Sequence, residues 1–235
     1  GNPDVFRMNP DGSEPVFMTS SVATDMSPQA SPSYQALEGR PIAYHSMSSD
    51  NLGGVHIWRM NTDGTDALEL TTSIEDGASP QWTPDGSRIT FDTLRDGDSE
   101  VYVMDADGTN QTNLTQSLEI WDTFPSWSHD GMRIVFQSDR DGDNEIFIMD
   151  ADGGALVQLT ENTVEDSIPR VSPDGAKIIF ISERDSNAEL YIMDLNGANL
   201  VNLSNTSQDE VSANWSPDGQ RIVFSSERDG HAQIY

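Results

Sequence analysis

The sequence predicts an all-β chain built from repeated four-stranded antiparallel sheets, and three observations support this fold class. The chain repeats itself at a nearly fixed period, its apolar residues alternate with a spacing of two, and tight-turn residues recur between short apolar stretches. The methionines that mark the repeat are 52, 44, 45 and 44 residues apart, at Met8, Met60, Met104, Met149 and Met193. Such a period is typical of repeat architectures, and no long helical period competes with it.

One repeat, residues 122–160, shows how each element is encoded. Tight turns are predicted where Asp and Gly occur together, because glycine tolerates a positive φ and aspartate bonds nearby backbone. Ile134 and Phe136 alternate with their neighbours on one face of a strand. The repeat therefore predicts four strands joined by three turns, with the strands at residues 124–128, 133–137, 146–149 and 156–160.

Two further features of the repeat favour a β-propeller over a single open sheet. Both registers of the third strand are apolar, whereas a half-solvated sheet is polar on one face. The first strand carries a proline in four repeats, which suits an edge strand because proline cannot donate to a ladder. These prolines are Pro28, Pro80, Pro125 and Pro169. A four-stranded unit of about 40 residues is also the size of one propeller blade.

The two ends of the sequence predict closure of a ring. Residues 4–6 align with residues 233–235, so strands three and four of one blade come first and strands one and two come last. We therefore expect one domain over residues 1–235, with five blades closed by both termini and no open edge. One copy of strand three is then redundant. The alternative is an arc of a six-bladed or larger ring.

Three motifs carry a resemblance to a known repeat family. They are Trp-Ser-Pro-Asp-Gly at residues 215–219, Ser-Asp-Arg-Asp-Gly at residues 138–142 and Met-Asp-Ala-Asp-Gly at residues 149–153. The motifs resemble the TolB-like β-propeller repeat, a relative of the WD repeats, and the resemblance covers essentially the whole chain. It implies a propeller but no single function, since such propellers occur as periplasmic scaffolds, as gating domains of serine peptidases and in polysaccharide-processing enzymes.

The amino-acid composition limits the classes of partner that the protein can bind. The 235 residues include 40 acidic and 12 basic ones and no cysteine, and the formal net charge is −28. Many basic residues occupy repeat positions, so we expect them to serve each blade's own structure, for instance Arg140 against Glu145. Nucleic acid and anionic membrane surfaces are disfavoured because both need positive patches. The sequence has no apolar run of about 18 residues, so we expect no membrane insertion. We also expect a monomer in an extracytoplasmic compartment, and the absence of cysteine favours that location.

An acidic residue precedes strand one in every repeat, and this pattern predicts a metal site. In a propeller this position lies at the mouth of the central channel, where ring symmetry brings like charges together. Hard cations such as Ca²⁺ take six to eight oxygen ligands. We therefore expect Ca²⁺ at the channel mouth, although each acid could instead cap its own turn. The predicted ligands are Asp25, Asp76, Asp122, Asp166, Asp209 and Glu210.

Signatures of catalysis are weak. The sequence has neither a Gly-x-Ser-x-Gly elbow nor a His-Glu-x-x-His motif. His45 and His56 flank an enlarged turn and could face each other as a metal or acid–base pair. Trp121, beside Asp122, is the candidate ligand-binding aromatic, and an exposed aromatic at the channel mouth would favour a glycan.

These observations favour a non-catalytic binding or scaffold propeller with a protein or glycan partner on one face. One alternative is a glycan-binding or glycan-cleaving propeller, because two carboxylates roughly 5 to 10 Å apart can hydrolyse a glycoside. The other is the gating propeller domain of a serine peptidase, whose catalytic part would lie outside this sequence.

Overall fold

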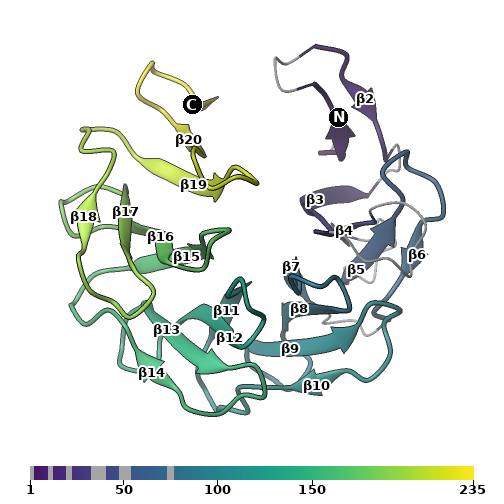
Figure 1. Ribbon diagram of the computed structural model, residues 1–235, viewed down its shortest axis with the longest axis horizontal. Coiled ribbons are helices and arrows are strands. Elements are labelled where there is room, and N and C mark those ends of the chain that lie inside the picture. The colour runs from purple at the N-terminus through teal and green to yellow at the C-terminus, as the bar shows by residue number, and fades with distance from the viewer. Residues whose placement is uncertain (1–2, 10–12, 20–22, 33–40, 48–53, 73–76) are drawn as a thin grey trace. The chain divides into compact units, whose positions relative to one another are not determined.

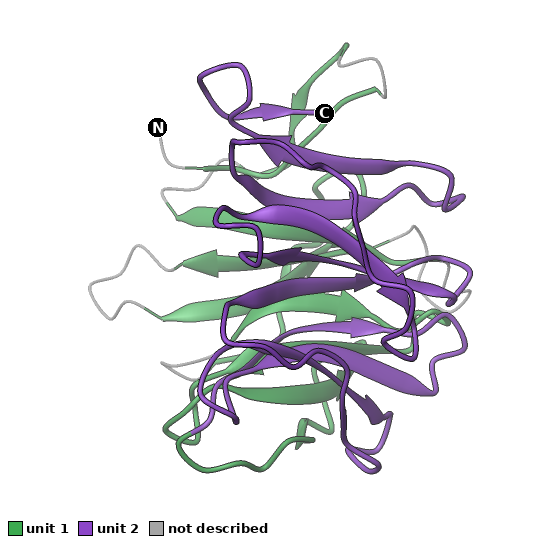
Figure 2. Cartoon of the chain, turned by 90° about the vertical axis from the view of Figure 1, so that its left-hand side faces the viewer, with its two compact units in different colours: residues 1–119 green, residues 120–235 purple. Residues whose placement is uncertain are grey.

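Every regular element of the protein is a β-strand in the parts that the computed structural model describes, which are residues 3–9, 13–19, 23–32, 41–47, 54–72 and 77–235 (Figure 1). The all-β class predicted from the sequence is therefore confirmed. No helix in these ranges is long and apolar enough to cross a lipid bilayer. The chain divides into two compact units, Gly1–Glu119 and Ile120–Tyr235 (Figure 2). The prediction of one domain over residues 1–235 stays a prediction.

Unit 1 contains a two-stranded sheet and two four-stranded sheets, all antiparallel. The two-stranded sheet consists of β1 (Phe6–Arg7) and β2 (Val16–Phe17). The four-stranded sheets follow chain order, with β3 (Thr24–Ala30), β4 (Ile42–Met47), β5 (Val55–Met60) and β6 (Leu68–Glu69) in the first, and β7 (Ala78–Trp82), β8 (Arg88–Thr93), β9 (Glu100–Asp105) and β10 (Thr112–Asn113) in the second.

Unit 2, which is described throughout, contains two four-stranded sheets and one three-stranded sheet. The four-stranded sheets consist of β11 (Asp122–Trp127), β12 (Arg133–Ser138), β13 (Glu145–Asp150) and β14 (Val157–Gln158), and of β15 (Asp166–Val171), β16 (Lys177–Ser182), β17 (Glu189–Asp194) and β18 (Val201–Asn202). The three-stranded sheet consists of β19 (Glu210–Trp215), β20 (Ile222–Ser226) and β21 (Gln233–Ile234).

These sheets are the blades of the predicted β-propeller class, because each is antiparallel and its strands are neighbours in chain order. The redundant copy of strand three has a definite place. β21 corresponds to β1 in the repeat, yet β21 pairs with β20, whereas β1 pairs with β2. Closure of a ring by both termini stays a prediction.

The first turn of each blade forms through short local contacts. In the β11–β12 turn, the Gly131 N–H donates to the Ser128 carbonyl at 2.9 Å, and Gly131 has a φ of 68°. Asp130 accepts the Met132 N–H at 3.0 Å and the Ser128 hydroxyl at 2.6 Å. These residues lie within five positions of one another in the chain, which is why the turn could be predicted from the sequence.

Strand one contains a bulge at its proline. The β11–β12 register shifts between Thr123 and Ser126, and Phe124 in that interval has a φ of 53°. The β15–β16 register shifts in the same way around Ile168 and Pro169. β11 and β15 are edge strands of their sheets, so the predicted edge position of the prolines is confirmed.

Both faces of the central strands are buried in the β11–β14 and β15–β18 blades of unit 2, as the two apolar registers predicted. Val135, Ile146 and Ile148 of one blade pack against Phe180 and Met193 of the next. Burying one such side chain contributes about 1.5–3 kcal/mol. The opposite face of the β15–β18 blade packs against the β19–β21 blade in the same manner, through Ile179, Ile181 and Leu190 against Ala213.

Candidate functional site

In each of the three blades of unit 2, an arginine in the second turn binds the acid that begins strand one. The Arg140 guanidinium donates to the Asp122 carboxylate at 2.8 Å and, through Nε, to the Ser138 hydroxyl at 2.8 Å. Its carbon Cζ lies 4.7 Å from the centre of the Phe147 ring and 5.7 Å from that of Phe136. The positive charge is thus neutralised by a carboxylate and stacked on aromatic rings. We call this arrangement the arginine clamp.

The arginine clamp recurs with the same spacing in the other blades of unit 2. Arg184 binds Asp166 at 2.6 Å and lies 4.8 Å from the Tyr191 ring centre. Arg228 binds Glu210 at 2.9 Å and lies 4.6 Å from the Tyr235 ring centre. In unit 1, Arg95 stacks on its own aromatic pair and donates to Gln111 at 2.6 Å. The arginines of the second turn therefore serve their own blades, as expected, but Arg140 binds Asp122 rather than Glu145, so that particular pairing was wrong.

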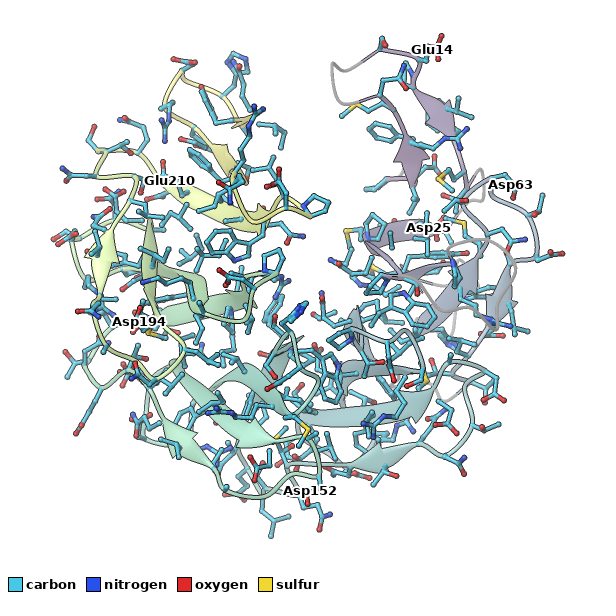
Figure 3. The ribbon with its side chains drawn as sticks, in the orientation of Figure 1. Glu14, Asp25, Asp63, Asp152, Asp194 and Glu210 are labelled. Carbon is cyan, nitrogen blue, oxygen red and sulfur yellow. The ribbon has the colours of Figure 1, made fainter. Side chains whose placement is uncertain are left out.

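The predicted calcium ligands fall into three groups. Asp122, Asp166 and Glu210 are fully buried and bound by the arginine clamps, and Asp25 on β3 is buried as well. Asp25 and Glu210 are labelled in Figure 3. Asp209 is exposed and accepts the Ala188 N–H at 3.1 Å. Asp76 lies outside the described residues. Among the described residues, no three acidic or histidine side chains gather as a metal-binding group. Calcium binding by these acids stays a prediction.

A second buried acid, which the sequence analysis named only as a partner for Arg140 and not as a site residue, begins strand three. Glu145 is fully buried and accepts the Asn162 backbone N–H at 2.5 Å. The Asn162 side-chain amide donates to Glu145 at 3.3 Å and to Asp166 at 3.0 Å, so it links the two carboxyl groups. Burial raises the pKa of Glu145 to about 7, and the Asp166 charge adds to the rise, whereas hydrogen bonds from Thr160 and Asn162 oppose it. The recurrence of Glu at this position, as Glu100 and Glu189, was the available signal.

Trp121 lies at the start of unit 2, immediately before β11, with 53% of its surface exposed. Its backbone N–H donates to the Asp139 carboxylate at 2.7 Å, which fixes the residue against the β12–β13 turn. The candidate ligand-binding aromatic is therefore accessible to a partner. Its role in binding stays a prediction.

The loops at one end of the unit 2 blades carry a strong negative charge. Because neighbouring strands are antiparallel, the turns between strands two and three share this end with the connections from strand four to the next strand one. We call it the second-turn face, and it comprises residues 120–121, 139–144, 159–165, 183–188, 203–209 and 227–232. Its ten acidic residues are Asp139, Asp141, Asp143, Glu161, Glu165, Glu183, Asp185, Asp209, Glu227 and Asp229. Its three arginines are those of the arginine clamps.

The opposite end of the unit 2 blades, the first-turn face, comprises residues 128–132, 151–156, 172–176, 195–200 and 216–221. These loops contain four acids, Asp130, Asp152, Asp174 and Asp218, together with Arg221. Asp152 in the turn after β13 is shown in Figure 3. Lys177 pairs with Asp194 at this end of the β16–β17 pair. The second-turn face thus has a larger excess of acidic over basic residues than the first-turn face.

The two histidines do not face each other. His45 pairs in register with Ile57, whereas His56 pairs with Ser46, so the rings project from opposite faces of the sheet. Burial lowers the pKa of His45, and His56 contacts Glu69 at 2.7 Å. The proposed metal or acid–base pair was wrong, because a strand changes face at every residue.

Antiparallel blades that recur along the chain, with acidic loops between their strands, define the class of repeat proteins called β-propellers. The family of TolB β-propeller domains matches residues 3–181 and 159–235, and the chain belongs to this family. The predicted TolB-like resemblance is confirmed.

Known proteins are similar to the chain over different lengths. The crystal structure of TolB from Acinetobacter baumannii is 25% identical with a TM-score of 0.80, covering 97% of this chain and 55% of its own. A putative TolB from Agrobacterium tumefaciens is 19% identical with a TM-score of 0.81, covering 97% of this chain and 81% of its own. Dipeptidyl-peptidase 5 of Porphyromonas endodontalis is 31% identical over 67 residues, or 28% of this chain. The chain spans 10% of that peptidase, so its activity is not carried over.

Proposed function

We propose that this chain is a non-catalytic binding or scaffold propeller that acts outside the cytoplasm. The family supplies the coarse class, since propellers offer rigid faces from which loops meet partners. The extracytoplasmic location rests on the family resemblance. The partner binds on a propeller face as a protein, and the chain itself is a monomer.

The observation that carries this proposal is the exposure of Trp121 on the second-turn face. Large aromatic side chains are enriched where proteins bind partners, and an exposed tryptophan that is fixed by its backbone loses little freedom on binding. Asp139 provides that fixation through the 2.7 Å hydrogen bond to the Trp121 N–H. The loops around it belong to rigid blades with buried faces.

A glycan is the second candidate partner, and the same tryptophan favours it because sugar rings stack on exposed indoles. Catalytic cleavage of a glycan has less support, since the buried acids Asp122, Asp166 and Glu210 bind arginines. The gating domain of a serine peptidase is a third candidate, in line with the short match to dipeptidyl-peptidase 5.

Calcium at the channel mouth remains part of the proposal. The acids that begin strand one carry it, because each repeat supplies one and few basic residues remain to neutralise the loop acids. Ca²⁺ at this place would either displace the arginines from the carboxylates of Asp122 and Asp166 or bind beside them.

The test compares Trp121→Ala with Met132→Ala, because Met132 is also exposed but lies on the first-turn face. Tryptophan fluorescence and calorimetry are recorded while octapeptides and oligosaccharides are added to each variant. Loss of binding with Trp121→Ala alone supports a partner on the second-turn face. Loss with Met132→Ala alone, or binding by no probe, contradicts the proposal.

A further inference from the structure

We infer that the second-turn face of unit 2 takes a cationic polypeptide segment, with a lysine or arginine side chain of the partner lying over Trp121. This inference rests on the proposed binding function and names the chemistry of its partner. Four observations lead to it, namely the unneutralised charge, the fixed carboxylates, one buried oxygen without a partner, and the exposed indole.

The acids of the second-turn face form no ion pair with the lysine or arginines of unit 2. Its three arginines, Arg140, Arg184 and Arg228, bind the buried acids that begin strand one. None of the ten loop acids forms an ion pair with lysine or arginine in unit 2, which is described throughout. A partner with positive charge is therefore attracted to this face over several ångströms.

Neutral donors hold several of these carboxylates in place. The Asp185 carboxylate accepts the Tyr191 hydroxyl and the Asn202 amide, and these hydrogen bonds hold its pKa below the usual value. Asp209 accepts the Ala188 N–H, and Asp141 accepts the Gln158 amide. Carboxylates held by such hydrogen bonds are fixed in position, so a cation meets them without a large cost in side-chain freedom.

Asp143 carries a carboxylate oxygen that no donor in the described part of the chain satisfies. Its Oδ2 oxygen is buried and has no hydrogen-bond partner. The corresponding residue of the next blade is Asn187, whose amide donates to the carbonyls of Thr206 and Gln208 at 3.3 and 3.0 Å. A carboxylate cannot donate in this way. Burial raises the pKa of Asp143, and the nearby charges of Asp141, Glu165 and Asp166 raise it further.

The indole of Trp121 gives the cation a second type of contact. Guanidinium groups lie over aromatic rings in every arginine clamp of unit 2, 4.6 to 4.8 Å from the nearer ring centre. Trp121 presents the same kind of surface to solvent, beside a strongly acidic loop. Tryptophan is the aromatic residue that binds cations best. A neutral sugar would use the indole but would leave the surrounding charge unanswered.

The test titrates full-length protein with octalysine, with a Gly-Ser octapeptide and with a neutral oligosaccharide, by calorimetry at low and high NaCl. The double variant Asp141→Asn with Glu165→Gln removes two charges from the second-turn face. The matched control, Asp150→Asn with Asp152→Asn, removes two exposed charges at the first-turn end. Both variants have a formal net charge of −26, which is −28 plus two.

We expect octalysine alone to bind, with an affinity that falls as NaCl rises. The Asp141/Glu165 variant should weaken it about tenfold and Trp121→Ala about fivefold, whereas the control should change it less than twofold. Equal weakening by the control overturns the inference, because attraction by net charge would explain it. Trp121-dependent binding of the oligosaccharide or the Gly-Ser peptide instead overturns the inference and leaves the binding function standing. Binding of no probe overturns both.

Discussion

The two ends of the unit 2 blades use aspartate in different ways. On the first-turn face, Asp130, Asp174 and Asp218 accept a backbone N–H two residues ahead and a serine hydroxyl two residues behind. At the second-turn end, Asp122 and Asp166 are bound by arginines that lie 18 residues further along the chain. The first-turn face is thus held by local hydrogen bonds and the second-turn end by buried ion pairs, so we expect the two ends to lose stability under different conditions.

We expect the largest loss of stability when a mutation removes the arginine of an arginine clamp. Arg140→Ala leaves the Asp122 carboxylate fully buried without its cation, and we expect a loss of about 3–5 kcal/mol in the free energy of unfolding. Arg133→Ala, at an exposed position near the first-turn face, should cost less than about 0.5 kcal/mol. Urea denaturation measures both. Equal losses would mean that the clamp does not distinguish the two ends.

The calcium prediction comes next in size. If Ca²⁺ binds only the folded protein, a hundredfold excess over the dissociation constant stabilises it by about 2.7 kcal/mol. Thermal melting with EDTA, Ca²⁺ and Mg²⁺ measures the shift, with Mg²⁺ as the control for charge screening. Asp122→Asn with Asp166→Asn should reduce the shift, and Asp98→Asn with Asp143→Asn should leave it. No shift beyond that of Mg²⁺ would count against a site.

The pH dependence of stability isolates Glu145. Its pKa is raised to about 7 in the folded protein from an ordinary value of 4.5, so the folded form holds the proton more tightly. The stabilisation is complete below pH 4.5 and is lost as the pH rises through about 7. Glu145→Gln should flatten this part of the profile. A wild-type profile that is flat from pH 5 to 8 would contradict the prediction.

The smallest effect belongs to the first-turn face. Ser172 is buried, and its hydroxyl accepts the Lys177 N–H at 2.9 Å and donates to Asp174 at 2.6 Å. Ser172→Ala should therefore cost about 1 kcal/mol, independent of NaCl concentration. Urea denaturation at low and molar NaCl tests this. A loss as large as that of Arg140→Ala would remove the contrast between local and distant contacts.

The sequence predicts what depends on neighbours in the chain. The turn around Asp130 and Gly131, the alternation of Ile134 and Phe136, and the proline on each edge strand follow from residues a few positions apart. The aromatic pair and the arginine of each clamp also repeat visibly. Their period alone does not say which acid the arginine binds, because Asp122 and Glu145 both recur at fixed distances from Arg140.

What could not be predicted depends on how buried groups share space. The link from Asn162 to both Glu145 and Asp166 joins a connection to two different strands, and no local motif encodes it. The opposite faces of His45 and His56 depend on strand register across a long turn. The sequence therefore named Trp121 and the strand-one acids, whose roles in binding stay predictions, and it named Glu145 only as a partner for Arg140.

The hydrogen bonds between neighbouring blades bear on how such a repeat protein evolves. The Trp215 indole donates to the backbone carbonyl of Arg170 in the preceding blade at 3.1 Å, and the Trp82 indole does the same to Gln29. Any amino acid offers that carbonyl, so this link between blades demands no particular partner side chain. The demanding electrostatic contacts, such as that of Arg184 with Asp166, stay inside one blade. A duplicated or exchanged gene segment that encodes a single blade would therefore bring its own charge balance with it and meet an acceptor already in place.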